Sequence, residues 1–333
     1  MDSVTKVLVT GCGGFIGKYI VQRLLEDESL IVYGVDRKEK LDALLSSDFL
    51  SALVLERFIP LSMDLTKQVE CAKLPEVNFV YHLAAINGTS LFYKIPWDVF
   101  YNSSLSTLNL IERYKGSKKL VRFIYTSTSE VYASLVDGNP KLFPTPEAVS
   151  VGFQDVLNSR WSYGGAKLAG EMALLSANKQ FDIPFSIIRY HNVYGPRMGL
   201  DHVIPDFIER GRRGVFELYG SENQRSFIYI SDAVNATLKI ARSTNALNQI
   251  IHVGTMEMVS MKYLAQKIMT LAKWSGNITE YPAPIGSTLA RCPDTTFLNS
   301  VVGFNPTVSL DTGLLEVLNA IPWIQAAIDK GEM

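Results

Sequence analysis

The chain has 333 residues, of which 47% are hydrophobic and 20% are charged, and its formal net charge is -1. This composition predicts a globular chain with a sizeable core in one large or two modest domains. No basic tract suited to nucleic acid or an anionic membrane is present, and no apolar run reaches the roughly 20 residues that span a bilayer. Neither the three cysteines nor the four histidines have metal-binding or disulfide-framework spacing, so we expect no metal site and a reducing, cytoplasmic location.

The first half of the chain alternates short β-rich runs with helical patterns. Strands are predicted at 4–11, 30–36, 56–64, 77–85, 121–127 and 184–195, and helices at 16–28, 97–115 and 161–181. In the first helix Ile16, Ile20, Val21 and Leu24 recur on one face. Strands alternating with helices predict a doubly wound parallel sheet with helices on both faces.

The pattern changes from about residue 190. Short strands are predicted at 215–220, 227–231 and 250–254, and helices at 204–211, 232–242, 260–273 and 309–320. We therefore predict an α/β fold with a Rossmann-type domain over 1–190 and a smaller mixed α/β lobe over 191–333. Segments near 221–255 are expected to return to the first sheet.

A glycine-rich run, TGCGGFIG, joins the first strand to the first helix and places glycines at 11, 14 and 17. Glycines in this position let the backbone approach a pyrophosphate, which binds at the helix N-terminus. Asp36 ends the second strand 19 residues after Gly17, as expected for an acid that binds a ribose hydroxyl. This acid favours NAD over NADP, although Arg37 and Lys38 follow it directly. Asp64 ends the third strand, where it either borders the adenine or caps a helix.

The run YGGAK places Tyr163 and Lys167 four residues apart, on one face of a predicted helix. A neighbouring ammonium favours the phenolate, so we expect Lys167 to lower the pKa of Tyr163. Such a tyrosine can accept a proton from a hydroxyl while a hydride leaves for the nicotinamide. The alternative is a core tyrosine beside a surface lysine.

A second polar run, TSTSEVY (126–132), follows the fifth strand, at the edge where parallel sheets bind ligands. We expect Thr126 and Ser127 to face the cofactor or the loop. Glu130 in a closed apolar pocket would have a raised pKa and could exchange protons near neutrality. The alternative is that Glu130 only orients the loop.

Taken together, these motifs make the chain resemble the extended short-chain dehydrogenase/reductases, in the NAD-dependent nucleotide-sugar epimerase/dehydratase/decarboxylase family. The matching elements are TGCGGFIG, Asp36, HLAA (82–85), TSTSEVY, YGGAK, RYHNVYGPRM (189–198), QRSFIYISD (224–232) and RCPD (291–294). They extend over almost the whole chain, and together they are specific for the family but much less so for the reaction.

The resemblance implies roles for individual residues. The catalytic set is Thr128, Glu130, Tyr163 and Lys167. The residues implied to bind NAD are Gly11, Gly14, Phe15, Ile16, Gly17, Asp36, Arg37, Asp64, Leu65, Leu83, Ala84, Ala85, Thr126, Tyr163, Lys167, Tyr190 and Val193. Those implied to bind the substrate are Asn87, Thr128, Ser129, Asn192, Arg225 and Arg291, with the two arginines on the diphosphate. His191, in the same loop as Asn192, is expected to be a buried structural histidine rather than a catalytic one.

The implied reaction begins with oxidation of the sugar at C4, most simply of a UDP-sugar. Glu130 favours a 4,6-dehydratase or a decarboxylase, whereas RYHNVYGPRM is more typical of decarboxylases and 4-epimerases. The segment 149–161 is longer than expected and should lie beside the sugar. A homodimer through the helices near 97–115 and 161–181 is also implied. The alternatives are an NADP-dependent carbonyl reductase and a non-catalytic NAD-binding regulator.

Overall fold

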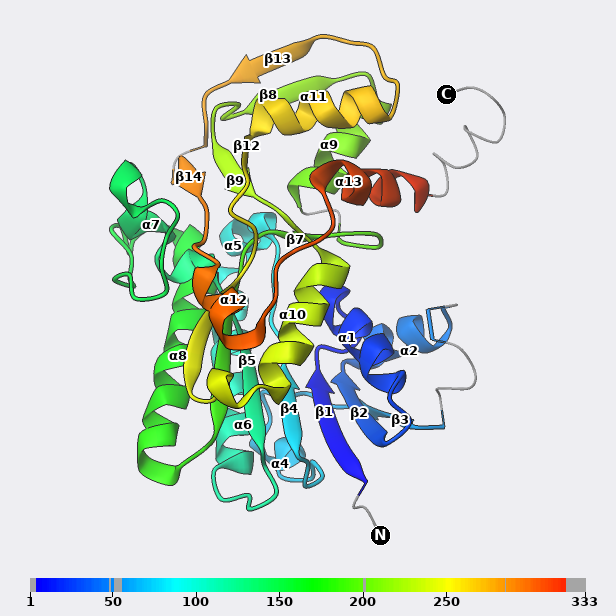
Figure 1. The fold of residues 1–333 in the computed structure, drawn as a ribbon, viewed down its shortest axis with the longest axis vertical. Coiled ribbons are helices and arrows are strands. Elements are labelled where there is room, and N and C mark those ends of the chain that lie inside the picture. The colour runs from blue at the N-terminus through cyan, green and yellow to red at the C-terminus, as the bar shows by residue number, and fades with distance from the viewer. Residues whose placement is uncertain (1–3, 48, 51–55, 200–201, 285, 322–333) are drawn as a thin grey trace.

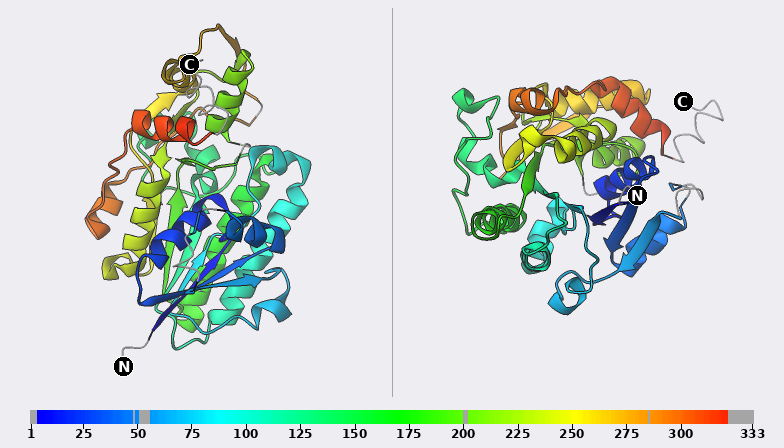
Figure 2. Two further views of the ribbon diagram at one scale, coloured as in Figure 1. Left: turned by 90° about the vertical axis from the view of Figure 1, so that its right-hand side faces the viewer. Right: turned by 60° about the horizontal axis from the view of Figure 1, so that its bottom comes forward.

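The computed structural model describes residues 4–47, 49–50, 56–199, 202–284 and 286–321. A large part built on one parallel sheet carries a smaller part at the end to which the strand arrows point (Figure 1). Two further views show the same arrangement from the side and from below (Figure 2). The smaller part therefore covers the carboxyl edge of the sheet, which is where open α/β sheets bind their ligands.

The main sheet has seven parallel strands in the order β11-β6-β5-β4-β1-β2-β3. These strands are β1 (Thr5–Thr10), β2 (Leu30–Asp36), β3 (Phe58–Ser62), β4 (Phe79–His82), β5 (Arg122–Thr128), β6 (Phe185–Tyr190) and β11 (Gln249–Val253). The chain runs outward from β1 in both directions, so the strand order reverses between β1 and β4. That reversal opens a crevice at the carboxyl ends of these two strands.

Helices cover both faces of this sheet, because its strands carry apolar residues on both sides. Val7 and Val9 of β1 face one core, whereas Leu8 between them faces the other. The first core includes α1 (Phe15–Leu25), α2 (Lys38–Leu45), α10 (Ile230–Arg242) and α12 (Thr296–Val302). The second includes α4 (Gln68–Cys71), α6 (Pro96–Tyr114) and α8 (Ser162–Phe181).

The smaller part has a core of its own, centred on Ile204, Leu264 and Leu314. Its helices are α9 (Val203–Arg212), α11 (Met261–Leu271) and α13 (Leu310–Asn319). Its strands are β8 (Phe216–Tyr219) and β13 (Ile278–Tyr281), which pair with each other, and β12 (Met258–Ser260), β9 (Gln224–Ser226) and β14 (Ala290–Arg291), which form a second small sheet.

The strands and helices predicted for the first half are confirmed, with ends shifted by a few residues. The long strand predicted at 184–195 is interrupted, because β6 ends at Tyr190 and Asn192 has a positive φ of 24°. Beyond the break, β7 (Val193–Tyr194) pairs with β10 (Ile228–Tyr229) instead. The strand predicted at 227–231 was wrong in its second half, since α10 already begins at Ile230.

Several short elements were not predicted. They include α2, α5 (Thr89–Lys94), α7 (Ala133–Val136), β12, β14 and α12. Across the part of the chain that the structure describes, no helix combines the length and apolarity needed to span a membrane. The three cysteines are buried and unpaired.

Candidate active site

The glycine turn between β1 and α1 brings bare backbone to the carboxyl edge of the sheet. Gly11 has a φ of +69°, and a Cβ on it would lie 2.9 Å from the backbone nitrogen of Ala84. A Cβ on Gly17 would lie 2.0 Å from the carbonyl oxygen of Gly11. Within the described residues no side chain caps the start of α1, so its first N–H groups are available to an anion. This backbone fits the pyrophosphate of a dinucleotide.

Asp36 is fixed beside that turn at the end of β2. Its Oδ2 accepts a hydrogen bond from the backbone N–H of Gly13 at 2.9 Å, and its Oδ1 accepts one from Arg37 at 2.8 Å. Burial raises the pKa of this carboxyl, and the two hydrogen bonds oppose the rise. The guanidinium of Arg37 donates to Asn102 Oδ1 at 3.1 Å. The acid thus lies where a ribose hydroxyl is expected.

The neighbouring strand ends are held by short polar contacts. Asp64 Oδ1 accepts hydrogen bonds from the backbone N–H and the hydroxyl of Thr66, at 3.0 and 2.7 Å. Its side chain therefore stabilises the turn before α4 and does not cap the helix, because the N-cap of α4 is Lys67 and receives no side-chain hydrogen bond. On the other side, Thr10 Oγ1 accepts from the N–H groups of Leu83 and Ala84 at 3.2 Å each.

Tyr163 and Lys167 lie on one face of α8, as their spacing predicted. Lys167 Nζ donates to the backbone oxygen of Thr126 at 2.7 Å and lies 5.9 Å from the centre of the Tyr163 ring. The Tyr163 ring stacks on Phe92 of α5 at 5.2 Å. Burial lowers the pKa of Lys167 to about 7, and Glu171, four residues further on, opposes the change.

The prediction that Lys167 lowers the pKa of Tyr163 was wrong for the protein by itself. Burial raises the pKa of this phenol above its usual value, and the negative charge of Glu130 adds to the rise. The charge of Lys167 was expected to outweigh burial because Lys167 lies on the same helix face as Tyr163. The structure directs its ammonium to the Thr126 carbonyl instead. A bound nicotinamide, being positive, would act in the direction of the phenolate.

The hydroxyls of TSTSEVY face different partners. Thr126 Oγ1 donates to the backbone oxygen of His82 at 2.9 Å. The expectation for Ser127 was wrong, because its hydroxyl donates to Glu171 beneath the sheet edge, at 2.5 Å. Thr128 ends β5, and its Oγ1 accepts from the backbone N–H of Glu130 at 3.3 Å. Ser129 is buried in the 3-10 turn Ser129–Val131 that follows.

Glu130 was expected in an apolar pocket with a raised pKa, and the structure contradicts this. Its Oε1 accepts from Arg291 Nη1 and lies 3.3 Å from Arg160 Nη2. Burial by itself would raise the pKa of Glu130, but the charges of Arg291, Arg160 and Arg225 outweigh burial and lower it. Glu130 is therefore ionised near neutral pH and is a base or an electrostatic group rather than a proton donor.

The residues expected to bind the diphosphate converge on the same place. Arg225 and Arg291 are direct neighbours on the paired strands β9 and β14. Arg225 donates to the backbone oxygens of Gln224 and Thr288 at 2.7 and 2.8 Å. Burial and the charge of Arg291 lower the pKa of Arg225 to about 9. Asn192 Nδ2 donates to the backbone oxygen of Ser226 at 2.8 Å.

The remaining predicted site residues are less directly placed. Asn87 is exposed just before α5. Phe15, Ile16 and Val193 pack against the first core, and Ala85 is partly buried after β4. Leu65 and Tyr190 are buried, and the Tyr190 hydroxyl lies 2.5 Å from Thr237 Oγ1 of α10.

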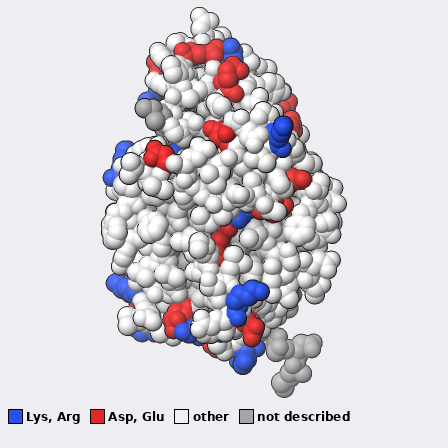
Figure 3. All heavy atoms as spheres, turned by 90° about the vertical axis from the view of Figure 1, so that its left-hand side faces the viewer, with Lys and Arg blue, Asp and Glu red and all other residues white. Residues whose placement is uncertain are grey.

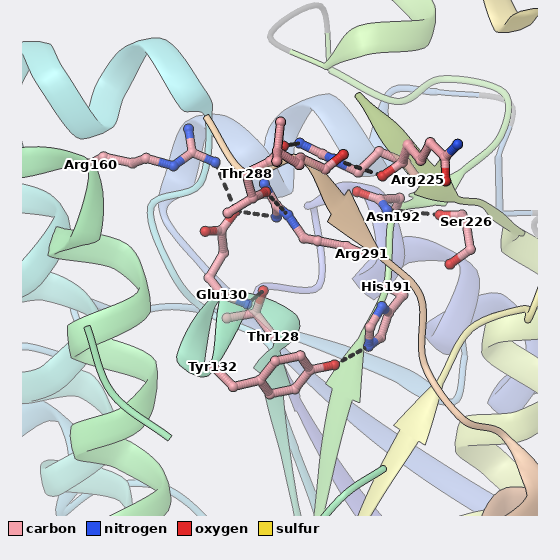
Figure 4. A network of polar contacts seen from close by, with 12 residues as sticks. Thr128, Glu130, Tyr132, Arg160, His191, Asn192, Arg225, Ser226, Thr288 and Arg291 are labelled. Carbon is pink, nitrogen blue, oxygen red and sulfur yellow. Dashed lines mark hydrogen bonds and ion pairs between the residues drawn. The ribbon is translucent and has the colours of Figure 1, made fainter. Parts of the chain in front are cut away.

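Arg160 was missed by the sequence reasoning. It is brought to Glu130 by a 3-10 turn, Ser159–Trp161, immediately before α8. The sequence signal for Arg160 was its position three residues before Tyr163, which places it next to the end of α8 that carries this tyrosine. We call Arg160, Arg225 and Arg291, together with Glu130, the arginine cluster (Figure 4).

The sequence also did not predict that His191 contacts Tyr132 and His252 in a buried polar group below the arginine cluster. Tyr132 Oη lies 2.6 Å from His191 Nε2, and the ring of His252 lies 5.3 Å from that of His191. Burial lowers the pKa of both histidines. His191 is buried, as expected, although its Nδ1 has no hydrogen-bond partner among the described residues, and its contact with Tyr132 joins the turn after Glu130 to the loop that carries Asn192.

The glycine turn, the acid after β2 and the tyrosine–lysine pair on α8 define a dinucleotide-dependent enzyme of the short-chain dehydrogenase type. The model of the NAD dependent epimerase/dehydratase family matches residues 7–254. The chain belongs to this family, and it is an NAD-dependent enzyme.

Individual relatives cover nearly the whole chain. UDP-glucuronic acid decarboxylase 5 of Arabidopsis thaliana is 30% identical over 326 residues, which cover 94% of this chain and 88% of that protein. UDP-N-acetyl-alpha-D-glucosaminuronate decarboxylase of Bacillus cytotoxicus is 31% identical over 325 residues, with 94% and 96% covered. The structure of UDP-glucuronic acid 4-epimerase from Bacillus cereus with UDP-glucuronic acid and NAD superposes with a TM-score of 0.82 at 26% identity, covering 97% of this chain and 99% of that one.

Proposed function

We propose that this enzyme oxidises the C4 hydroxyl of a nucleotide-diphosphate sugar, most simply a UDP-sugar, and later returns the hydride to the product. The observation that carries the proposal is the Tyr163–Lys167 pair on α8, whose lysine donates to the Thr126 carbonyl near the carboxyl end of β5, the strand that Thr128 ends. The names of the relatives support the substrate class, since they act on or bind UDP-sugars.

When bound, NAD would supply the hydride acceptor and donor, and the residues of the protein would move the proton. Tyr163 takes the proton of the C4 hydroxyl while Thr128 hydrogen-bonds that oxygen. Lys167 supplies positive charge beneath them and holds the nicotinamide ribose. The stacked Phe92 holds the plane of the tyrosine ring.

The cofactor would be held by the backbone of Gly11, Gly14 and Gly17 at its pyrophosphate and by Asp36 at a ribose. Asp64 and Leu65 would border the adenine, while Leu83, Ala84 and Thr126 would line the groove. We also propose the domain division expected from the sequence, in which residues 1–190 bind NAD and residues 191–333 mainly bind the nucleotide sugar. Residues 322–333 of that second range lie outside the described chain.

The diphosphate of the substrate would be held by Arg225, Arg291 and Asn192. Guanidinium groups suit this task because they present several N–H donors in a fixed plane and stay charged. Arg225 supports this assignment, since burial and the nearby charge of Arg291 lower its pKa to about 9. An anion at this place would remove that penalty.

Glu130 bears on the type of reaction. Elimination of water across C5 and C6 needs a group that donates a proton to the leaving hydroxyl, and the arginines keep Glu130 ionised. We therefore favour decarboxylation or 4-epimerisation over 4,6-dehydration. Both preferred reactions can use an ionised carboxylate as an electrostatic group beside the sugar.

We further propose a homodimer in which α6 and α8 meet their counterparts. Leu108 of α6 is 49% exposed and Met172 of α8 is 62% exposed. Figure 3 shows that charged side chains are sparse across the middle of one broad face. The three buried free thiols support a reducing, cytoplasmic location.

The direct test is to incubate the purified protein with UDP-, GDP-, CDP- and dTDP-sugars, with NAD added, and to follow the products by NMR. Turnover of a UDP-sugar with a change at C4 or loss of carbon dioxide is the expected result. No turnover of any nucleotide sugar by protein that has NAD bound would remove the proposal.

A further inference from the structure

The strand that carries Arg291 depends on contacts outside its own small sheet. β14 consists of Ala290 and Arg291, and its register with β9 pairs Ala290 with Gln224 and Arg291 with Arg225. Strands in globular proteins usually have roughly 3 to 10 residues, and a shorter one gains few ladder bonds. The relative position of the Arg225 and Arg291 backbones therefore depends on what else holds this strand.

Asp137 holds the start of β14 from outside the sheet. Its Oδ1 accepts hydrogen bonds from the backbone N–H groups of Leu289 and Ala290, at 2.6 and 3.3 Å. Asp137 directly follows α7, and the loop around α7 lies beside β14 (Figure 1). A carboxylate is a stronger acceptor for N–H groups than a neutral oxygen is. The side chain of Asp137 thus fixes the two residues that lead into Arg291.

Both guanidinium groups are bound to the stretch of chain that Asp137 holds. Arg225 donates to the carbonyls of Thr288 and Leu289, at 2.8 and 3.3 Å. Arg291 Nε donates to the hydroxyl of Thr288 at 2.9 Å. These contacts bring the two side chains together around Thr288 (Figure 4). A shift of this short stretch would therefore move both guanidinium groups at once, although they belong to different strands.

The chain that follows α7 contacts this region a second time, just beyond Arg291. The N–H of Thr145 donates to the carbonyl of Cys292 at 2.8 Å, and the N–H of Asp294 donates to the carbonyl of Thr145 at 2.7 Å. The turn that carries Glu130 lies shortly before α7 in the chain. The chain that leaves this turn thus contacts both ends of the strand that carries the ion-pair partner of Glu130.

The charge of Asp137 does not by itself help an anion to bind. Burial and the charge of Arg291 lower the pKa of Arg225 to about 9. The negative charge of Asp137 is among those that oppose this change, so it acts on Arg225. A carboxylate in reach of Arg225 also repels a diphosphate bound there. If charge alone decided the effect of Asp137, its removal would make a diphosphate bind more tightly, whereas a role in positioning predicts the opposite sign.

We propose that Asp137 is a positioning residue for the nucleotide diphosphate, because it holds the start of β14 and so keeps Arg225 and Arg291 side by side. This role rests on the proposed function, in which these two arginines bind the diphosphate. It extends the binding site to a side chain that acts only through the arginines. Loss of Asp137 should therefore affect binding of the nucleotide and not the chemical step.

The test measures the Kd of UDP, and kcat and KM with the UDP-sugar that the substrate panel identifies, on NAD-loaded full-length protein. Asp137→Ala removes the acceptor of both N–H groups, and we expect Kd and KM to rise about 10-fold. The value of kcat should stay the same, as is typical when only binding is lost. Asp137→Asn keeps an oxygen that accepts N–H groups but has no charge, so it should bind UDP as tightly as wild type or more tightly.

Two further variants make the result specific. Asp27→Ala removes an acid that likewise accepts two hydrogen bonds, from Ser29, and pairs with Arg242, and it should change neither Kd nor KM. Arg225→Met should weaken UDP binding by itself, and adding Asp137→Ala to it should cause little further loss, because the two residues act as a unit. Thermal melting and bound NAD show that each variant is folded.

Several outcomes overturn this role of Asp137. They are unchanged or tighter binding of UDP by Asp137→Ala, an equal loss in Asp137→Asn, a fall in kcat without a rise in KM, and full additivity with Arg225→Met. Any of these, in a protein that turns over a UDP-sugar, overturns the role of Asp137 alone. Failure of every nucleotide sugar would instead overturn the proposed function.

Discussion

The glycine turn and the arginine cluster meet at one edge of the sheet but are built differently. The turn lies between consecutive elements, β1 and α1, and is held by backbone contacts that leave no room for a side chain. The arginine cluster joins side chains from four separate segments, and Glu130 is 161 residues from Arg291. The first region is defined by shape, and the second by a balance of charge.

The difference matters for how each region responds to a ligand. A packed backbone turn has the same form with or without a pyrophosphate, so it can be fully formed in advance. Like charges in a partly buried cluster repel one another until an anion arrives, and Glu130 supplies only one. We therefore expect the cluster to gain more stability from ligand than the turn does.

The largest effect is expected from Tyr163→Phe. Loss of the phenol removes the proposed proton acceptor, and we expect turnover to fall about 1,000-fold. The aromatic ring should still stack on Phe92, so bound NAD and the melting temperature should change little. The measurement is kcat with the UDP-sugar that the substrate panel identifies.

A control for this variant is Tyr219→Phe, on a side chain that is 48% exposed in the smaller part. It should retain full activity. A Tyr163→Phe protein with more than a tenth of the wild-type kcat would show that the proton goes elsewhere.

A smaller effect on activity, with a distinct effect on stability, is expected from Glu130→Gln. Turnover should fall roughly 10- to 100-fold if Glu130 takes part in the chemistry beside the sugar. The free protein should also melt at a lower temperature, because two guanidinium groups lose their partner. UDP should restore most of that loss, since its diphosphate replaces the missing anion. The measurements are kcat, and melting temperature with and without UDP.

The matched variant is Glu209→Gln, which breaks solvent-accessible pairs with Arg212 and Arg213 at the end of α9 and should have almost no effect. Full activity in Glu130→Gln would leave this residue only an orienting role. Absence of any rescue by UDP would instead contradict the charge-balance account of the arginine cluster.

The smallest effect is a pH-dependent gain in stability from Lys167→Met. The pKa of Lys167 is lowered to about 7 in the folded protein, so below that value the fold carries a costly buried charge. As the pH rises from 7 toward the unfolded value near 10.4, the folded state releases the proton and the cost disappears. The variant should thus melt roughly 3 °C above wild type at pH 6, with a smaller advantage at pH 9.

Lys179→Met, at the exposed end of the same helix, should show no such trend. An advantage of Lys167→Met that grows with pH would reverse the sign of the argument. Activity of this variant should be low at every pH, because the ammonium beneath Thr126 is gone.

The sequence predicted the parts of the site that depend on neighbours along the chain. Tyr163 and Lys167 share a helix face by their spacing alone, and Asp36 follows from its distance to Gly17. The surroundings of Glu130 could not be predicted in this way, since its partners come from a turn 30 residues later and a strand 161 residues later. Without those partners, burial was the remaining guide to its pKa, and it gave the wrong direction.

The fold shows the same limit. Long strands with apolar residues on both faces were predicted well, because periodicity and length mark them. The break after Tyr190 was not, since it depends on the positive φ of Asn192 and on the pairing of β7 with β10. Short elements such as β14 form because the chain already lies beside β9, which no local pattern reveals.

The arginine cluster also has a consequence for how quickly a substrate arrives. The whole chain has a formal net charge of -1, so its average field does not attract anions. A local excess of guanidinium groups in a mostly buried site can still focus a positive potential outward. Ions in solution screen that potential over about 8 Å at physiological salt, but they do not reach between the buried groups. Added salt should therefore slow the association of a nucleotide sugar while leaving its dissociation nearly unchanged.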